Sequence, residues 1–202
     1  RSFHVTGVQT CALPISATKS LINLYSNNAR LSAKSFPSFP AQRATEVKMK
    51  FDECPDVRLA HISDEPELMR LTELACSEDA QHSFNPQKVN AFLHLHFNKQ
   101  GGVIGVIGER GGEIKGYILM MVTEVWYSSD YHVQELSLFV APDHRRSNYA
   151  KQLMAFAKRT SDALNLDLTI GVLSNHRTQP KVRLYQRQFP QKGAFFIYHP
   201  AG

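Results

Sequence analysis

The sequence predicts one α/β domain over residues 49–202, with a mixed, twisted sheet of about six to seven strands and about four helices. Segments with the two-residue period of strands alternate with segments that have the 3.6-residue period of helices. Between residues 102 and 140, strand-like segments follow one another without a helix, so an antiparallel run is expected. A helix then separates residues 131–140 from the apolar segment 166–173, and such a crossover makes the two strands parallel.

Helix-start signals mark the first half of the domain. A short strand is expected at residues 57–62, and the Ser-Asp pair that follows can cap a helix that runs to about Cys76. Asn85 precedes Pro86, a combination that opens a second helix. Apolar residues at helical spacing in both segments predict that each helix packs one face against the sheet.

Three consecutive strands are expected in the middle of the chain, at residues 102–108, 114–126 and 131–140. A glycine-bearing turn at residues 109–113 joins the first two as a hairpin. The segment 166–173 is almost entirely apolar, which is typical of a strand buried on both faces. A last helix is expected after Ser174 and a last strand at residues 193–198.

One stretch combines a strand end with the start of a helix at Asn148. Pro142 ends the strand, because proline cannot donate a hydrogen bond to a sheet. The first N–H groups of the helix have no partner within it and lie at the positive end of its dipole, which suits a phosphate. Arg145 and Arg146 precede the helix although cations are disfavoured there, and this favours an anion site.

The same stretch resembles the signature of the GNAT superfamily, the acetyl-CoA-dependent N-acetyltransferases. That signature has the pattern Gln/Arg-x-x-Gly-x-Gly/Ala after a strand that ends in Val-x-Pro. Arg145, Asn148 and Ala150 occupy its three marked positions, with Asn148 where glycine is usual. Asparagine is one of the few residues other than glycine that tolerate positive φ, so the turn of the family remains possible. The resemblance extends over residues 57–198.

The resemblance implies how acetyl-CoA is held. In the family, the central strand and the strand after the helix diverge, and pantetheine lies between them against the backbone of the central strand. The pyrophosphate meets N–H groups of the turn and the helix start, and here Arg145 sets the turn. Carried over to this sequence, the cofactor-binding residues are Leu138, Phe139, Val140, Arg145, Arg146, Ser147, Asn148, Tyr149, Ala150, Lys151 and Asn175.

Acetyl transfer needs a neutral amine, and a carboxylate can accept the proton that the amine must lose. Glu135 is the candidate base, because it lies on the central strand just before the cofactor-binding backbone. Strand alternation places it on the same face as Ser137 and Phe139. An ordinary solvent-facing glutamate is the alternative reading, and Glu124 and His132 are reserve candidates.

Tyr185 is the candidate acid for the departing thiolate. Leu184 and Tyr185 match the Leu-Tyr pair of the family's fourth-helix motif, whose hydroxyl commonly approaches the CoA sulfur. A phenol has a pKa of about 10 and a thiol one of about 8.5, so the proton transfer is feasible. The alternative is an aromatic side chain that packs on the sheet.

The charge distribution and the cysteine content limit which binding partners are expected. The formal net charge is +5, but residues 1–48 carry all of it and residues 49–202 are neutral, so nucleic-acid binding is not expected. The three cysteines are odd in number and lack metal-ligand spacing, which favours a reduced, cytoplasmic setting without a metal. The apolar runs are too short to cross a membrane.

Residues 1–48 differ from the rest of the chain. Residues 5–15 resemble the conceptual translation of a sequencing adapter, and the following segment is rich in Ser, Ala, Asn and Pro without periodicity. We expect a disordered tail that is foreign to the natural protein, with Met49 as the true start. A transit peptide is the alternative, because the segment is basic and poor in acidic residues.

The leading hypothesis is an N-acetyltransferase that moves an acetyl group from acetyl-CoA to a primary amine by direct attack in a ternary complex. The acceptor is a small molecule or a protein, and the enzyme is expected to be a monomer or homodimer that engages no membrane. Trp126, Tyr127 and Tyr131 are expected near the acceptor unless they are core residues. The alternative function is a GNAT-like domain that binds acyl-CoA without turnover, as a sensor or assembly component.

Overall fold

The computed structural model describes residues 57–79, 82–108, 113–173 and 178–194. The chain divides into two compact units, Arg1–Ser38 with Pro190–Gly202, and Phe39–Phe189. The second unit contains every described helix and strand. The predicted tail and residues 195–198 of the expected last strand lie outside the described residues, whereas residues 193–194 are described and belong to no strand.

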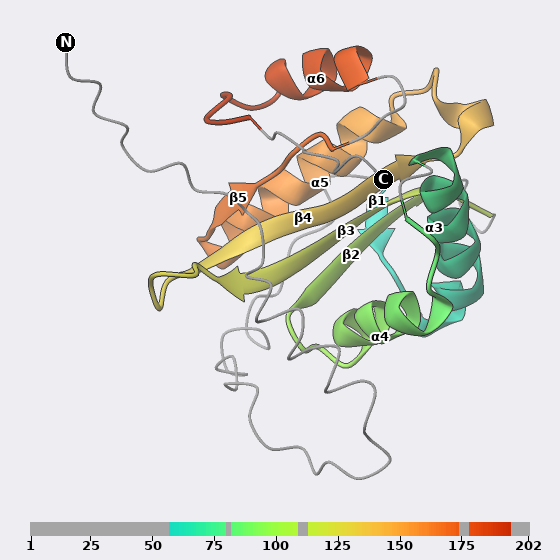
Figure 1. Cartoon of the computed structure of the whole chain (residues 1–202), viewed down its shortest axis with the longest axis horizontal. Coiled ribbons are helices and arrows are strands. Elements are labelled where there is room, and N and C mark those ends of the chain that lie inside the picture. Colours follow the sequence, from blue (N-terminus) through green and yellow to red (C-terminus); the bar gives the residue numbers. More distant parts are fainter. Residues whose placement is uncertain (1–56, 80–81, 109–112, 174–177, 195–202) are drawn as a thin grey trace, which may run out of the picture. The chain divides into compact units, whose positions relative to one another are not determined.

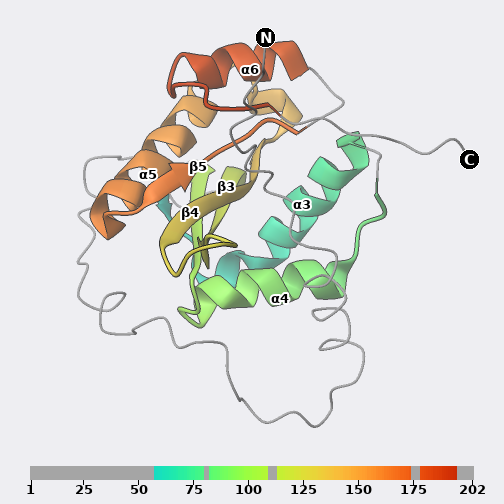
Figure 2. The ribbon, with the colours of Figure 1, turned by 60° about the vertical axis from the view of Figure 1, so that its left-hand side comes forward.

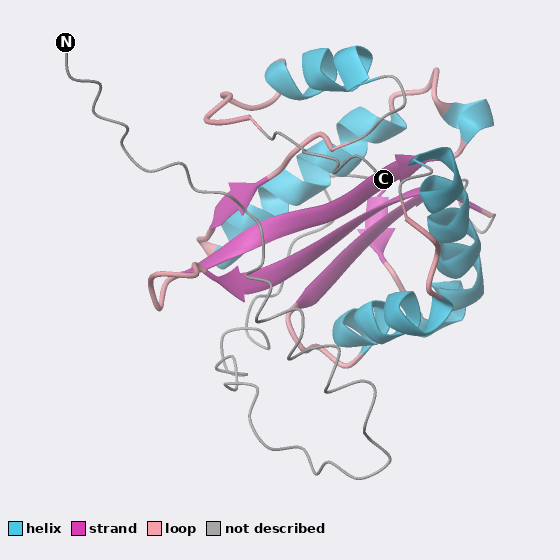
Figure 3. Ribbon diagram, in the orientation of Figure 1, coloured by secondary structure: helices cyan, strands magenta, loops and turns pink. Residues whose placement is uncertain are grey.

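A five-stranded mixed sheet forms the middle of the second unit, with its strands in chain order (Figures 1 and 3). The strands are β1 (Val57–Leu59), β2 (Gly102–Gly108), β3 (Ile114–Glu124), β4 (Tyr131–Val140) and β5 (Asp167–Thr169). Neighbours from β1 to β4 are antiparallel, and β4 and β5 are parallel. The mixed sheet and both strand directions are therefore confirmed, but the described residues form five strands rather than the expected six to seven.

The helices begin near the expected signals. They are α3 (Glu65–Asp79), α4 (Pro86–Phe97), α5 (Tyr149–Leu164) and α6 (Thr178–Gln186). The side chain of Asn85 caps α4 by accepting from the N–H of Lys88 at 2.9 Å. Before α3, a short 3₁₀ turn (Ile62–Asp64) replaces the end of the expected first strand, and the Asp64 carboxylate pairs with Arg58 at 2.6 Å.

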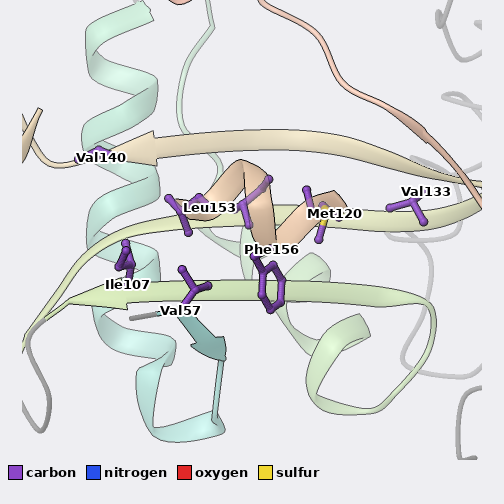
Figure 4. Close-up of a cluster of buried hydrophobic side chains, with 9 residues drawn as sticks. Val57, Ile107, Met120, Val133, Val140, Leu153 and Phe156 are labelled. Carbon is purple, nitrogen blue, oxygen red and sulfur yellow. The ribbon is translucent and has the colours of Figure 1, made fainter. Parts of the chain in front are cut away.

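Helices cover both faces of the sheet, with α5 on one side and α3 and α4 on the other (Figure 2). On the α5 side, Leu153 and Phe156 pack against Met120 and Val133, and all of these side chains are fully buried (Figure 4). Gly105 makes this packing possible, because a Cβ atom there would lie 2.7 Å from the Phe156 ring. On the other side, leucines of α3 and α4 pack on β2 and β3. β4 contributes to both cores, with Val133 and Val140 on the α5 side and Phe139 on the other side.

The strand that follows α5 is shorter and more exposed than its composition predicts. Only Asp167–Thr169 of the expected strand 166–173 pairs with β4, and no residue of that segment is fully buried. The prediction of burial on both faces is wrong, because β5 is the last strand of the sheet formed by the described residues and is covered incompletely.

Candidate active site

The ladder between β4 and β5 covers only the beginning of β4. It pairs His132, Val133 and Gln134 with Asp167, Leu168 and Thr169. Beyond the last pair, the N–H of Gly171 donates to Oε2 of the Glu135 side chain at 3.3 Å, whereas β4 continues to Val140. The two strands therefore part at Glu135.

A β-bulge lies at the same point of β4. Leu119 opposes Ser137 and the next residue, Met120, opposes Glu135, so Leu136 has no partner in β3. Directly opposed residues share a face of a sheet, and consecutive residues lie on opposite faces. Glu135 and Ser137 therefore face opposite sides. The expectation that they share a face is wrong, because the bulge interrupts the alternation.

The pattern of hydrogen bonds between β3 and β4 determines which backbone groups of β4 point away from β3. The N–H of Ala141 donates to the carbonyl of Lys115 at 2.8 Å, and in an antiparallel pair such bonds recur at every second residue. Phe139 therefore directs its backbone groups to β3, while Leu138 and Val140 direct theirs to the edge that β5 has left. Of the three expected backbone contacts, the groups of Leu138 and the N–H of Val140 have no partner among the described residues, whereas the Val140 carbonyl accepts from Nε of Arg145 at 3.2 Å.

The start of α5 presents free N–H groups. The N–H groups without a partner among the described residues are those of Arg146, Asn148, Ala150 and Lys151. The N–H of Ser147 bonds the carbonyl of His144 at 3.1 Å, and the N–H of Tyr149 bonds the Ser147 hydroxyl at 3.2 Å. The first turn of α5 contains no acidic residue, so nothing in it offsets the positive end of the helix dipole.

Asn148 occupies this turn without strain. Its φ is −86°, so the position does not need the positive φ for which asparagine seemed suited, and its side chain makes no capping hydrogen bond. The side chains of Arg146 and Lys151 are exposed and have no ion pair with any described residue. An anion at this turn would therefore meet both free N–H groups and unpaired cations.

Arg145, in contrast, is held by the protein itself. Its Nη2 donates to both carboxylate oxygens of Glu78 on α3, at 2.6 and 2.5 Å. Its Nε donates to the carbonyl of Val140 at 3.2 Å, and its guanidinium lies 5.5 Å from the centroid of the Phe139 ring. These contacts agree with a role in setting the turn. Sequence reasoning missed Glu78, because it lies 67 positions from Arg145 and no local pattern marks it.

Glu135 has the electrostatics of a base that works near neutral pH. Burial raises the pKa of its carboxyl to about 7, and the hydrogen bond from the Gly171 N–H lowers that pKa in part. An ordinary solvent-facing glutamate, the alternative reading, does not have such an environment. Gly171 could have indicated this contact from the sequence, because a glycine inside a strand pattern often marks a close approach of the backbone.

Tyr185 lies on α6 within electrostatic reach of Glu135. Burial raises the pKa of its hydroxyl well above the usual value, and the charge of Glu135 raises it further. The structure thus brings the candidate acid and the candidate base into one electrostatic environment. Asn175, which was expected to contact the cofactor, lies outside the described residues.

The remaining candidates lie at the other end of β4. Trp126 and Tyr127 are in the turn between β3 and β4 and are 74% and 63% exposed, so the reading of these two residues as core is wrong. The hydroxyl of Tyr131 donates to the Glu124 carboxylate at 2.9 Å. His132 pairs with β5 at the start of the ladder. The structure does not bring Glu124 to the point where the strands part.

The described residues contain neither a cluster of metal ligands nor a helix suited to a membrane. Their histidine, cysteine, aspartate and glutamate side chains form no group of three or more that could hold a metal ion. His96, one of the histidines, hydrogen-bonds the carbonyl of Ala60 at 2.9 Å. No helix in the described ranges has the length and apolar character needed to cross a membrane.

Residues 66–189 match the model of the acetyltransferase (GNAT) family. The matched segment contains the parted strands, the start of α5 and α6, which are the features described above. The chain belongs to the GNAT acetyltransferase family. No curated protein sequence matches it.

Solved structures share the fold. An integron cassette protein from the mobile metagenome of Cole Harbour Salt Marsh is 24% identical, with a TM-score of 0.58 over 74% of this chain and 92% of that one. The ribosomal-protein-alanine N-acetyltransferase of Brucella melitensis biovar Abortus 2308 is 15% identical, with a TM-score of 0.55 over 73% and 99%. An aminoglycoside acetyltransferase from an uncultured soil metagenomic sample is 15% identical, with a TM-score of 0.54 over 72% and 95%.

Proposed function

We propose that the protein is an N-acetyltransferase that moves an acetyl group from acetyl-CoA to a primary amine, by direct attack of the amine in a ternary complex. The observation that carries this proposal is the short β4–β5 ladder, which ends at Gln134 and Thr169 and leaves a partly buried carboxyl, that of Glu135, where the strands part. Membership of the family supports acetyl-CoA as the donor. The acceptor is a small molecule or a protein that carries a free amine.

The start of α5 has the donors that a diphosphate requires. The free N–H groups of Arg146, Asn148, Ala150 and Lys151 lie together at the positive end of the helix dipole. The exposed side chains of Arg146 and Lys151 add positive charge and attract an anion from solution. Ser147, whose hydroxyl supports the turn, completes the binding segment.

The open edge of β4 suits the amide-containing arm of CoA. Leu138 and Val140 direct backbone groups to the edge that β5 has left, and an extended ligand can hydrogen-bond there as a neighbouring strand would. This edge connects Glu135 with the turn before α5. The acetyl thioester, which acetyl-CoA supplies, would then lie near Glu135. Asn175 remains a predicted contact.

Glu135 removes the proton that keeps the acceptor amine inactive. An amine with a lysine-like pKa of about 10.4 is protonated at pH 7, and removing its proton costs about 4.6 kcal/mol. With a pKa of about 7, Glu135 is a stronger base than an ordinary glutamate and is still ionised in a large share of molecules. After Glu135 takes one proton, the nitrogen bonds to the acetyl carbonyl carbon and the carbon–sulfur bond breaks. The nitrogen then gives up its second proton, which restores the hydroxyl of Tyr185 once Tyr185 has protonated the sulfur.

Tyr185 donates its hydroxyl proton to the departing sulfur. Burial raises the pKa of Tyr185, and the charge of ionised Glu135 raises it further, so Tyr185 is a weaker acid while Glu135 is ionised. When Glu135 has accepted the amine proton, that charge is gone and the pKa of Tyr185 moves down toward that of the thiol. Neutralisation of Glu135 therefore makes Tyr185 a better proton donor to the departing sulfur.

Release of free thiol from acetyl-CoA, measured with pooled small amines and peptides, tests the proposed function. We expect Glu135→Gln to lower kcat/KM by about 10²- to 10⁴-fold, the range for loss of a general base. Tyr185→Phe should lower kcat more than it weakens acetyl-CoA binding. Glu124→Gln, at the exposed end of β3, and Tyr127→Phe, in the exposed turn after it, are matched controls and should keep wild-type rates.

The pH dependence of wild-type kcat/KM gives a second readout. Because the base must be ionised, kcat/KM should fall below pH 7 and level off above it, in line with the Glu135 pKa of about 7. Acetyl-CoA binding without thiol release for any acceptor would indicate a binding domain instead.

A further inference from the structure

Glu78 joins α3 to the turn in front of α5. Its two carboxylate oxygens accept from Nη2 of Arg145 at 2.6 and 2.5 Å. The Arg145 and Glu78 side chains are only 24% and 25% exposed, so this ion pair is shielded from water more than a surface pair is. The pair is therefore a defined tertiary contact between α3 and the turn before α5.

Other contacts fix the guanidinium of Arg145 in place. Its Nε donates to the carbonyl of Val140 at 3.2 Å, and its Cζ atom lies 5.5 Å from the Phe139 ring centroid. The Phe139 ring in turn lies 6.2 Å from the ring of Tyr117, which is almost completely buried. Arg145 is thus held by the end of β4, by the core and by α3 at once.

This arrangement separates two tasks at the anion site. The charge of Arg145 is balanced by Glu78, so Arg145 adds little net attraction for an anion. Arg146 and Lys151, exposed and without an ion pair among the described residues, provide that attraction. The Glu78–Arg145 pair instead joins α3 to the turn that carries the free N–H groups.

We propose that Glu78 is a positioning residue for acetyl-CoA: through Arg145, it holds the turn so that the N–H groups at the start of α5 face the diphosphate. In this arrangement Arg145 supports the turn and does not bind phosphate. This inference rests on the proposed function, because it assumes that acetyl-CoA binds at the start of α5.

The competing arrangement predicts effects of opposite sign. If Arg145 left Glu78 to bind the diphosphate, Glu78 would compete with the ligand for the guanidinium. Removing the Glu78 carboxylate would then free Arg145 and tighten acetyl-CoA binding. If Glu78 positions the turn, removing its carboxylate weakens binding.

Titration calorimetry with acetyl-CoA and steady-state kinetics on the full chain distinguish these arrangements. We expect Glu78→Ala to raise the dissociation constant about threefold to tenfold, as for loss of a partly shielded ion pair, with kcat at saturating acetyl-CoA unchanged. Glu78→Gln, whose amide oxygen still accepts a hydrogen bond, should show a smaller rise. Glu73→Ala, at an exposed position of the same helix, is the control and should bind as wild type does.

A double-mutant cycle tests whether Glu78 acts through Arg145. In the Arg145→Gln background, Glu78→Ala should add no further loss of affinity, because the connection is already broken. The inference is overturned if Glu78→Ala leaves binding unchanged, tightens it, or weakens it equally in that background. If Glu78→Ala does not fold, the same cycle with Glu78→Gln gives the test.

Acetyl-CoA binding by the wild-type protein shows whether the proposed function or only this inference has failed. Wild-type binding of acetyl-CoA with thiol release supports the function, whatever the Glu78 variants do. If wild-type protein binds no acetyl-CoA, both the proposed function and the inference fail. If wild-type protein binds it and the Glu78 variants bind it equally well, the inference alone fails.

Discussion

At the scale of single residues, Glu135 shows how a catalytic environment costs stability. Its carboxyl has a pKa of about 7 in the folded protein, against an ordinary value of 4.5. Because the folded pKa is raised, the stability that Glu135 contributes is fully present below about pH 4.5 and is lost as pH rises through 7. Above that range, folding must keep a charged carboxylate in a buried position.

Replacing Glu135 with glutamine removes this penalty. At pH 8, Glu135→Gln should be more stable than the wild type by up to about 3 kcal/mol, the free energy that corresponds to the raised pKa. At pH 5 the difference should largely disappear, because wild-type Glu135 is then protonated. Urea unfolding at both pH values measures the two free energies, with Glu124→Gln as the control. A difference of equal size at both pH values would contradict this account and point to side-chain packing.

Residues of the site differ in how far the sequence could reveal them. Glu135 and Tyr185 could be proposed, because each has a defined place relative to a motif of the family. Glu78 could not, since its partner Arg145 comes from a distant part of the chain. The face of Glu135 was predicted wrongly, because the sequence around Leu136 alternates regularly and does not reveal the bulge.

At the scale of elements, α5 begins without the groups that normally stabilise a helix start. Asn148 makes no capping bond and the first turn has no acidic residue. These absences leave N–H groups free for an anion, and they also leave the helix less stable than it could be.

Asn148→Asp should therefore change stability and ligand binding in opposite directions. A carboxylate at this position interacts favourably with the helix dipole and should raise the free energy of unfolding by about 0.3–1 kcal/mol. The same charge repels a diphosphate, so the dissociation constant for acetyl-CoA should rise. Thermal unfolding and calorimetric titration measure the two effects. If the variant bound acetyl-CoA as well as the wild type does, the diphosphate would have to lie elsewhere.

The elements themselves could be predicted where the sequence signal is local. The bounds of β2 and β4 agree with the expected strands, and Asn85 caps α4 as expected. The strand after α5 was predicted too long, because its apolar residues indicate burial but do not show where pairing ends. That end depends on the path of the chain after Thr169, which no local pattern determines.

At the scale of the whole molecule, the two hydrophobic cores on the faces of the sheet are built by residues from Val57 to Leu168. The family match likewise covers residues 66–189. A protein that lacks residues 1–48 should therefore unfold at the wild-type temperature and bind acetyl-CoA with wild-type affinity. Calorimetric unfolding and titration of the shortened and full chains test this. A loss of binding would return the basic tail to consideration as a functional part.

The parted strands have a consequence for handling the protein. Without acetyl-CoA, the end of β4 has backbone groups that pair with no strand among the described residues, and unpaired strand edges favour association with other chains. A bound ligand would cover them, and at a concentration one hundred times its dissociation constant would add about 2.7 kcal/mol of stability. We expect light scattering on warming to appear at lower temperature in cofactor-free solutions. The most aggregation-prone form of this protein is then the one left after thorough dialysis.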